Sequence, residues 1–165
     1  MKTIYLETEL PASADKVWHA MCHPASFTYV TRGLIGILAL AGRTEPFREG
    51  ESGTGWLLLL FHLIPISRHT IYLASLDEPA RTLRSREHGG VLRTWNHTLH
   101  AEPAGDQRCR YSDTVDIDAG PLTGFIATLA IWVFQYRQRR WHKLVRNHLR
   151  PSGPRYATKA RSEPA

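Results

Sequence analysis

The sequence predicts an α+β fold, in which a curved antiparallel sheet of six to seven strands wraps around one long C-terminal helix, with two short helices after the first strand. Three observations lead to this prediction. The first residues alternate between polar and apolar side chains. Segments with the same alternation follow one another from residue 54 to residue 118. After Gly120 the apolar residues recur at three and four positions instead of two.

The N-terminal part is expected to form one strand and two short helices. Thr3–Leu10 alternates as a half-buried strand does. Ser13 is a suitable cap for a helix that Pro24 ends, and a weaker helical pattern covers residues 25–30. The apolar segment 33–42 is compatible with a strand, a helix or a loop that lines a cavity.

Five further strand segments occupy the middle of the chain, each bounded by turn residues. They are Thr54–Leu63, Arg68–Leu76, Arg81–Glu87, Val91–Ala101 and Arg108–Asp118. Their spacing is typical of an antiparallel meander. Both faces of the first segment are apolar, so the sequence does not show which face of residues 54–63 points inward.

Pro121 suits the first position of a long helix, of about 25 residues. Its buried face is expected to contain Leu122, Phe125, Ile126, Leu129, Val133, Tyr136, Arg140 and Leu144. A twisted sheet cannot close flat against a single helix, and we therefore expect a cavity between them. Trp132, Phe134 and Trp141 lie off this face and are expected to cap the core, with a homodimer interface as the alternative.

Positive charge is concentrated at the C-terminal end. The net charge is +6, but residues 136–165 carry nine basic and one acidic side chains, which leaves 12 basic and 14 acidic ones elsewhere. A solvated helix end, favoured by the helix dipole, explains this charge. Contact with an anionic membrane is the alternative, and nucleic-acid binding is less favoured. Residues 150–165 are poor in apolar side chains and are expected to be a disordered tail.

The remaining composition argues against several classes of protein. Cys22 and Cys109 lie far apart, and no paired cysteine motif occurs, so we expect neither a metal nor another cofactor. The N-terminal residues lack a hydrophobic leader segment, which predicts a cytoplasmic protein.

Several short stretches resemble a known superfamily. They are the opening LPASADKVWHAMCHPASF (residues 10–27), Trp95-Asn96-His97, Asp113-Thr114-Val115 and Gly120-Pro121-Leu122. Together they resemble the START-like helix-grip (SRPBCC) superfamily, in its polyketide cyclase/dehydrase-like branch. The resemblance implies a single helix-grip domain over residues 1–149. It does not imply a reaction, because the superfamily includes lipid carriers, hormone receptors, cyclases and toxin subunits.

The last predicted hairpin contains the best candidate for chemistry. Matching its two apolar faces requires that paired residue numbers sum to an even value. With a five-residue loop centred on Gly105 the sum is 210, which places His97 opposite Asp113 on the inward face. Such a pair suits three roles: a general acid or base, an anchor for a ligand carbonyl or hydroxyl, or a satisfied polar pair of the core.

Other residues are candidates for contact with a ligand. They are Trp56, His69, Trp95, Leu99, Tyr111, Val115, Phe125 and Leu129. Arg84 or Arg86 would face inward if the Gly89-Gly90 turn had two residues, but a surface position is favoured.

Two classes of function follow, of which we favour the first. The first is binding of a hydrophobic small molecule, of lipid, quinone or aromatic polyketide type, in the internal cavity. The second is a cyclase, dehydratase or isomerase that uses His97 and Asp113 as an acid/base pair. A third hypothesis, binding of RNA or an anionic membrane through the basic C-terminal end, depends on residues 136–165.

Overall fold

The computed structural model describes residues 1–37, 40, 42–59 and 64–149. Seven strands form one antiparallel sheet in the order β1-β7-β6-β5-β4-β3-β2. Their bounds are β1 Lys2–Leu10, β2 Ile35–Ile37, β3 Ser52–Leu59, β4 Ile64–Asp77, β5 Thr82–Gly89, β6 Leu92–Pro103 and β7 Cys109–Asp118. The helices are α1 Ala14–Met21, α2 Pro24–Thr31 and α3 Thr123–Leu144. The predicted α+β fold is confirmed.

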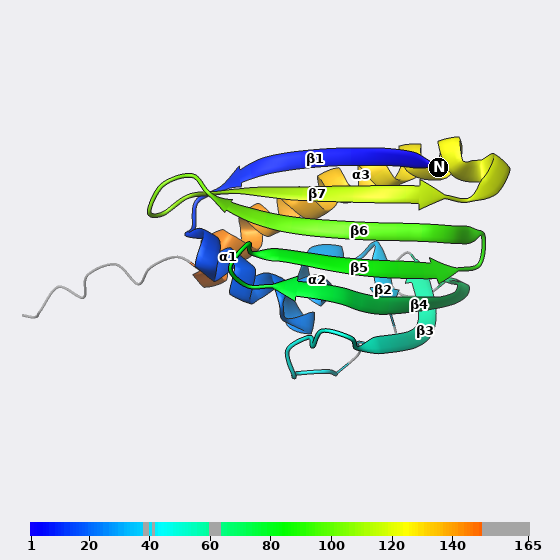
Figure 1. Cartoon of the computed structure of the whole chain (residues 1–165), viewed down its shortest axis with the longest axis horizontal. Coiled ribbons are helices and arrows are strands. Elements are labelled where there is room, and N and C mark those ends of the chain that lie inside the picture. Colours follow the sequence, from blue (N-terminus) through cyan, green and yellow to red (C-terminus); the bar gives the residue numbers. More distant parts are fainter. Residues whose placement is uncertain (38–39, 41, 60–63, 150–165) are drawn as a thin grey trace, which may run out of the picture.

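The helices cover one face of the sheet (Figure 1). The long helix α3 packs against β1 and β7 and also against α2. A short 3-10 turn, Gly120–Leu122, precedes α3, and a π-helical turn, Val145–Leu149, follows it. No helix in the described part of the chain is long and apolar enough to cross a membrane. The predicted tail, residues 150–165, lies outside the described residues.

Irregular pairing bends the sheet away from a flat plane. The register shifts between Leu73 and Ser75 in β4, and again between Glu87 and Gly89 where β5 pairs with β6. Such shifts increase the local twist of a strand. The sheet therefore curves around the helices and does not lie flat against them.

The predicted elements of the N-terminal half are present with adjusted ends. Ser13 occupies the cap position of α1, although its side chain makes no capping hydrogen bond. The ambiguous segment 33–42 contributes β2, and residues 38, 39 and 41 lie outside the described part. Strand β3 runs from Ser52 to Leu59, and the rest of predicted segment 54–63 is likewise not described.

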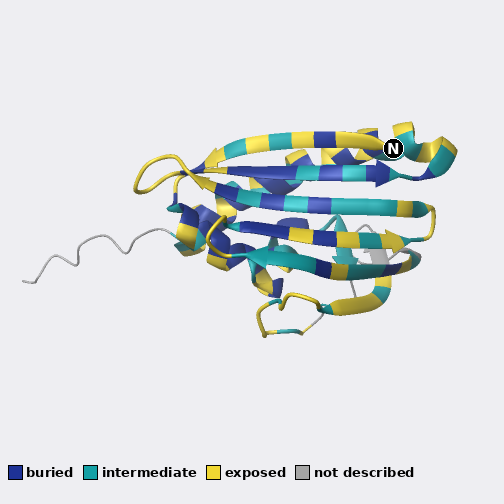
Figure 2. Ribbon diagram, in the orientation of Figure 1, coloured by how far each residue is buried: buried dark blue, intermediate teal, exposed yellow. Residues whose placement is uncertain are grey.

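The core has two parts. One lies under α1 and the C-terminal end of α3, and the other lies between α3 and strands β1 and β7. Strand β7 is buried or half-buried along much of its length, whereas exposed residues are frequent on β1, on β3 and in the loops (Figure 2). The middle strands face the helices across a wider gap, which is the location of the candidate site.

The buried face of α3 differs from the predicted one by a rotation of one residue. Its buried side chains are Ala127, Ala130, Phe134, Arg137, Gln138, Trp141 and Leu144. Phe134 and Trp141, expected to cap the core from beside the predicted buried face, are 1% and 2% exposed and belong to the core, whereas Trp132 is 55% exposed. Of the predicted buried face, Leu144 is buried but Phe125 is 69% exposed. This face was predicted from the three- and four-residue spacing of the apolar side chains, and this spacing did not show that the small Ala127 and Ala130 lie against the sheet.

Candidate functional site

Two pockets that share four lining residues lie between the sheet and the helices. Lobe A has a volume of about 230 Å³ and is lined by α1, α2, segment 40–53, the inner face of β4–β6 and the C-terminal half of α3. Lobe B has a volume of about 340 Å³ and is lined by α2, β2, the start of β4, the β5–β6 hairpin and the first half of α3. The two pockets lie in the region where the sequence predicts a cavity.

Four residues line both lobes: Phe27, Glu87, His97 and Arg137. We call these four residues the waist. Three of them carry charged or titratable side chains, and they come from β5, β6 and α3 respectively. The waist therefore places a polar group of residues between two lobes whose linings are mostly apolar.

The His97–Asp113 pair forms as predicted, but by a different register. His97 Nε2 lies 2.9 Å from Asp113 Oδ1, and both side chains are buried. In the β6–β7 ladder His97 pairs with Val115 and Leu99 with Asp113, so paired numbers sum to 212. The two side chains meet diagonally across the ladder. The predicted sum of 210 was wrong because Pro103 is the last residue of β6, which moves the turn one residue along the chain.

Asp113 has no exposed surface and is ionised. Burial alone raises its pKa, but the Arg137 guanidinium and the hydrogen bond from His97 lower it more, so that the net shift is downward. Tyr111 donates a further hydrogen bond to the same oxygen at 3.0 Å. Burial and the charge of Asp113 hold the pKa of this tyrosine well above its ordinary value, which keeps the phenol protonated as a donor.

Arg137 was expected on the solvated end of the helix but is buried at the waist. Its Nη2 lies 3.8 Å from Asp113 Oδ1, and its guanidinium sits 4.6 Å above the centre of the Phe134 ring. Its Nε has no hydrogen-bond partner among the described residues. Because a buried unpaired donor is costly, this N–H group favours an acceptor supplied from the cavity.

A second imidazole–carboxylate pair joins β4 to the waist residue Glu87 on β5. His69 Nε2 lies 2.8 Å from Glu87 Oε2, and Ser85 donates a 2.7 Å hydrogen bond to Glu87 Oε1. Burial raises the pKa of Glu87, but the hydrogen bond from His69 and the charge of His97 lower it further than burial raises it. Glu87 is thus a second ionised carboxylate inside the fold.

The two carboxylates fix the orientation of the protons on the imidazoles. An ionised carboxylate only accepts hydrogen bonds, so His69 and His97 each donate through Nε2–H. Nδ1 is then the nitrogen of His97 that remains for proton exchange with a ligand. An imidazole oriented by a carboxylate next to a cavity has the arrangement that general acid/base chemistry requires.

The predicted ligand-contact residues fall into three groups. His69, Trp95 and Leu129 line lobe B, and Leu99 lines lobe A. Tyr111 and Val115 are fully buried in β7 and do not belong to the described linings. Trp56 is 48% exposed and Phe125 is 69% exposed, and both lie outside these two pockets.

Sequence reasoning missed Glu87, Ser85 and the buried position of Arg137. On β5 the even-numbered Arg84 and Arg86 are exposed, in line with the favoured expectation. Their odd-numbered neighbours face the cavity as a result. The polar residues 84–87 (RSRE) are typical of a solvated strand. Only the apolar Leu83, on the same face of the strand as Glu87, indicates that the Glu87 side chain points inward.

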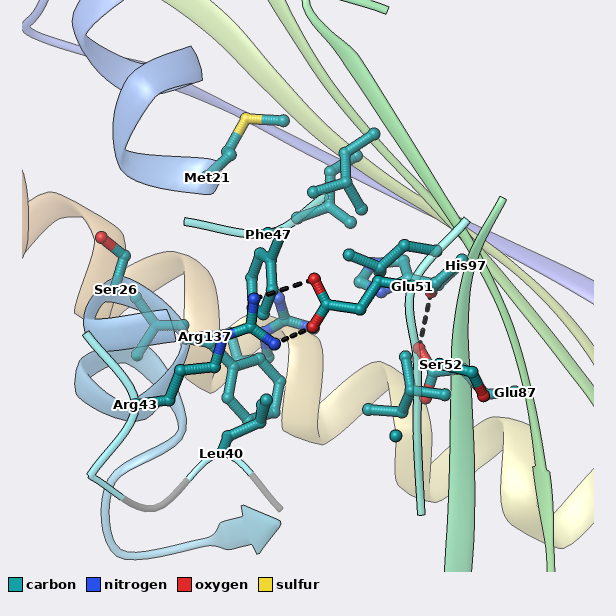
Figure 3. Close-up of a pocket in the computed structure, with 18 of the residues that line it drawn as sticks. Met21, Ser26, Leu40, Arg43, Phe47, Glu51, Ser52, Glu87, His97 and Arg137 are labelled. Atoms are coloured by element: carbon teal, nitrogen blue, oxygen red, sulfur yellow. Dashed lines mark hydrogen bonds and ion pairs between the residues drawn. The ribbon is translucent and has the colours of Figure 1, made fainter. Parts of the chain in front are cut away.

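Residues 42–53 line lobe A and are held by an ion pair. Arg43 pairs with Glu51, and its guanidinium also lies 5.5 Å from the centre of the Phe47 ring. Figure 3 shows this pair together with Phe47 and Arg137 around the pocket. The two charges neutralise each other, and their side chains are about one-quarter exposed (24% and 27%), so they belong to the outer wall of the lobe.

The two cysteines take no part in this site. Neither lines a described pocket, and neither forms a disulfide. Burial, with smaller contributions from Glu78 and Glu9, raises the pKa of Cys22 and Cys109 to about 11 in each case. Thiols with such values are poor nucleophiles at neutral pH.

A curved antiparallel sheet that holds a long C-terminal helix defines the helix-grip class of fold. Solved structures share this fold. An aromatase/cyclase from Streptomyces sp. R1128 has 12% identity and a TM-score of 0.68, with 92% of this chain and 98% of that chain covered. A START superfamily protein from Mycobacterium smegmatis has 13% identity and a TM-score of 0.64, with 87% and 97% covered. Norcoclaurine synthase from Thalictrum flavum has 19% identity and a TM-score of 0.64, with 89% and 87% covered.

These likenesses confirm the predicted START-like helix-grip (SRPBCC) fold. Residues 8–147 match the model of the family described as "Domain of unknown function (DUF8410)", and the chain belongs to this family. A comparison with curated proteins finds no match.

Proposed function

We propose that this protein binds a hydrophobic small molecule, of lipid, quinone or aromatic polyketide type, in the cavity between the sheet and α3. The observation that carries the proposal is the pair of pockets of about 230 and about 340 Å³ inside the described fold. Apolar side chains such as Leu83, Leu99 and Val133 line them, and filling such space with apolar ligand surface is favourable. The aromatase/cyclase and the START protein share the fold, which supports a cavity-based role.

The first test asks whether the purified full chain binds apolar molecules at this place. Native mass spectrometry would detect a co-purified ligand, and the fluorescent probe anilinonaphthalene sulfonate would report on empty apolar space. In Leu83→Phe the larger side chain fills part of lobe A, and in Leu129→Trp it fills part of lobe B. Both variants are expected to weaken binding of a ligand that uses the filled lobe by tenfold or more.

Matched variants control for the added bulk alone. The controls are Leu76→Phe and Leu122→Trp. Leu76 lies on β4 and Leu122 directly precedes α3, and neither residue belongs to the described linings. Both controls are expected to bind as the wild type does. Absence of any bound ligand or probe, or equal weakening by fillers and controls, would contradict the proposed binding function.

A second candidate function is acid/base catalysis of the cyclase, dehydratase or isomerase type. The 2.9 Å contact of His97 with Asp113 at the wall of both lobes favours it. In such a reaction Nδ1 of His97 would take a proton from a carbon next to a ligand carbonyl, while the Arg137 N–H groups would stabilise the negative oxygen. His97 then returns this proton, or one that it has exchanged with water, to the same or a neighbouring carbon.

The test for this second function follows exchange of ligand protons, because it requires no known product. A bound ketone with acidic α-hydrogens is incubated in heavy water, and deuterium uptake is followed by NMR. His97→Gln is expected to remove enzyme-dependent exchange while ligand affinity changes less than exchange does. If the ligand exchanged its protons no faster with the wild-type protein than in buffer alone, His97 would be an anchoring residue only.

A further inference from the structure

We propose that the ligand has two apolar arms joined by an uncharged central oxygen acceptor, with one arm in each lobe and the oxygen at the waist. This inference rests on the proposed binding function and names the class of molecule that the site takes. It is carried by the distribution of polar groups along the cavity, by the sizes of the lobes and by the charges of the waist.

The polar groups concentrate where the lobes meet. Glu87, His97 and Arg137 line both lobes. Away from them, the charged pair of lobe A, Arg43 with Glu51, is satisfied within itself at the outer wall. Lobe B beyond the waist is lined chiefly by apolar side chains of α3 and by the β5–β6 hairpin. A ligand that occupies both lobes therefore meets apolar, polar and again apolar surroundings.

Each lobe is large enough for a ring-sized arm. An apolar cavity of about 150 Å³ takes up benzene. Lobes A and B exceed this volume, at about 230 and about 340 Å³. Gly90 lines lobe B in the β5–β6 turn with a φ of +56°, and a Cβ there would lie 2.7 Å from Ser67 Cβ. A larger residue would therefore not fit at this part of the wall.

Among the four waist residues, the buried group without a partner is a donor. Arg137 is 6% exposed, and its Nε–H has no partner among the described residues. Asp113 Oδ2 and His69 Nδ1 also lack a partner there, but Asp113 lines neither lobe and His69 lines lobe B only. A ligand oxygen that accepts from Arg137 would satisfy the unpaired donor, whereas a ligand hydroxyl that only donates would not.

The charges of the waist and its neighbours indicate that this oxygen is uncharged. Two carboxylates, Glu87 and Asp113, lie beside one guanidinium, Arg137. Their lowered pKa values leave a formal charge of −1 on these three groups. A carboxylate ligand would add a second negative charge next to them, which is unfavourable. A ketone, quinone or ester oxygen adds no charge.

The test compares small probes with identical arms and different centres. Dibenzyl ketone carries a central carbonyl, dibenzylmethane replaces it by a methylene group, and dibenzylacetic acid carries a central carboxylate. Binding to the full chain at neutral pH is measured by calorimetry. We expect the ketone to bind about tenfold more tightly than the hydrocarbon, as a hydrogen bond to a charged group gives. The carboxylate should bind more weakly than the ketone.

Occupation of both lobes is read from tryptophan side chains. Trp141 lines lobe A and Trp95 lines lobe B, whereas Trp132 is 55% exposed on α3. In the nitrogen-labelled protein, dibenzyl ketone should shift the indole N–H signals of Trp95 and Trp141 along one saturation curve and leave that of Trp132 in place. Trp→Phe variants assign the signals.

The Arg137→Lys variant distinguishes the contribution of the waist to ligand affinity from that of the lobes. The lysine keeps the positive charge but lacks the Nε–H group, so the advantage of the ketone over the hydrocarbon should fall to about twofold or less. The affinity of this variant for dibenzylmethane should stay within about twofold of the wild-type value. That result would show that the lobes remain intact.

Several outcomes would overturn the inference. They are equal binding of ketone and hydrocarbon, tighter binding of the carboxylate, a shift of only one of the two tryptophan signals, and no binding of the ketone at all. If apolar probes still bind and respond to the lobe-filling variants, the proposed function stands without this ligand class. If no apolar probe binds, both fail.

Discussion

At the scale of single residues, the unusual feature is two largely buried carboxyl groups with lowered pKa values, Glu87 in the wall of both lobes and Asp113 bonded to His97. Asp113 has Arg137, His97 and Tyr111 around it, and Glu87 has His69 and Ser85. Removing one partner of a buried charge leaves the other uncompensated, which costs about 3–5 kcal/mol. These polar residues therefore bind one another as a unit, and single changes among them affect stability as well as ligand binding.

The lowered pKa values predict how stability depends on acid. Folded Asp113 and Glu87 release their protons more readily than the unfolded chain, whose carboxyl pKa values are about 4. Their contribution to stability is therefore fully present above about pH 4.5 and is lost as the pH falls through the lower folded-state values. We expect the free energy of unfolding to fall steeply below about pH 4 and to fall less steeply in Asp113→Asn. Urea unfolding across a pH series measures both.

An exposed carboxylate provides the control for this prediction. Asp106 lies in the turn between β6 and β7 and is exposed. Asp106→Asn should keep the acid dependence of the wild type. If Asp113→Asn lost stability in acid as steeply as the wild type, the ionised buried carboxylate would not be the cause.

At the scale of elements, α3 both closes the core and supplies half of the cavity wall. Ala127 and Ala130 are 0% and 3% exposed and pack with Ile4, Val115 and Phe134. Their small side chains hold the helix close to β1 and β7. The same approach leaves the helix farther from β4–β6, where the two lobes lie.

Enlarging this contact should separate the helix from the sheet. Ala127→Leu is expected to lower the free energy of unfolding by about 1–3 kcal/mol, because the added methyl groups overpack a filled core. Thr128→Leu places the same leucine side chain at an exposed position of the same helix and should change stability by less than about 0.5 kcal/mol. Chemical unfolding measures both variants. A tolerated Ala127→Leu would show that the contact is loose.

At the scale of the whole molecule, the cavity makes stability depend on its occupant. A ligand that binds only the folded state stabilises it, by about 2.7 kcal/mol when its concentration is one hundred times Kd. Dibenzyl ketone, or a co-purified ligand once isolated, should therefore raise Tm by several degrees in the wild type.

Variants with one lobe filled distinguish cavity binding from surface binding. Leu83→Phe and Leu129→Trp should reduce the ligand-dependent rise in Tm, while Leu76→Phe and Leu122→Trp should keep it. Scanning calorimetry with and without ligand gives the comparison. An equal rise in all variants would place the ligand outside the two lobes.

The predictable features are those set by local pattern. Alternation in Thr3–Leu10 and from residue 108 onwards determined which side chains face inward, and His97 and Asp113 were paired because a one-residue slip would place apolar groups in water. The exact partner was not predictable, since the register depends on where the turn starts, and Pro103 ends a strand instead of starting the loop.

The sequence by itself determined the order of the elements, the fold class and the inward direction of His97, Asp113 and their apolar neighbours, because these follow from period and turn chemistry along the chain. Only the tertiary structure decided that Arg137 and Glu87 lie at the waist and that the cavity has two lobes. Which face of α3 is buried depends on how closely small side chains let it approach the sheet. That distance is set jointly by elements that are far apart in the sequence.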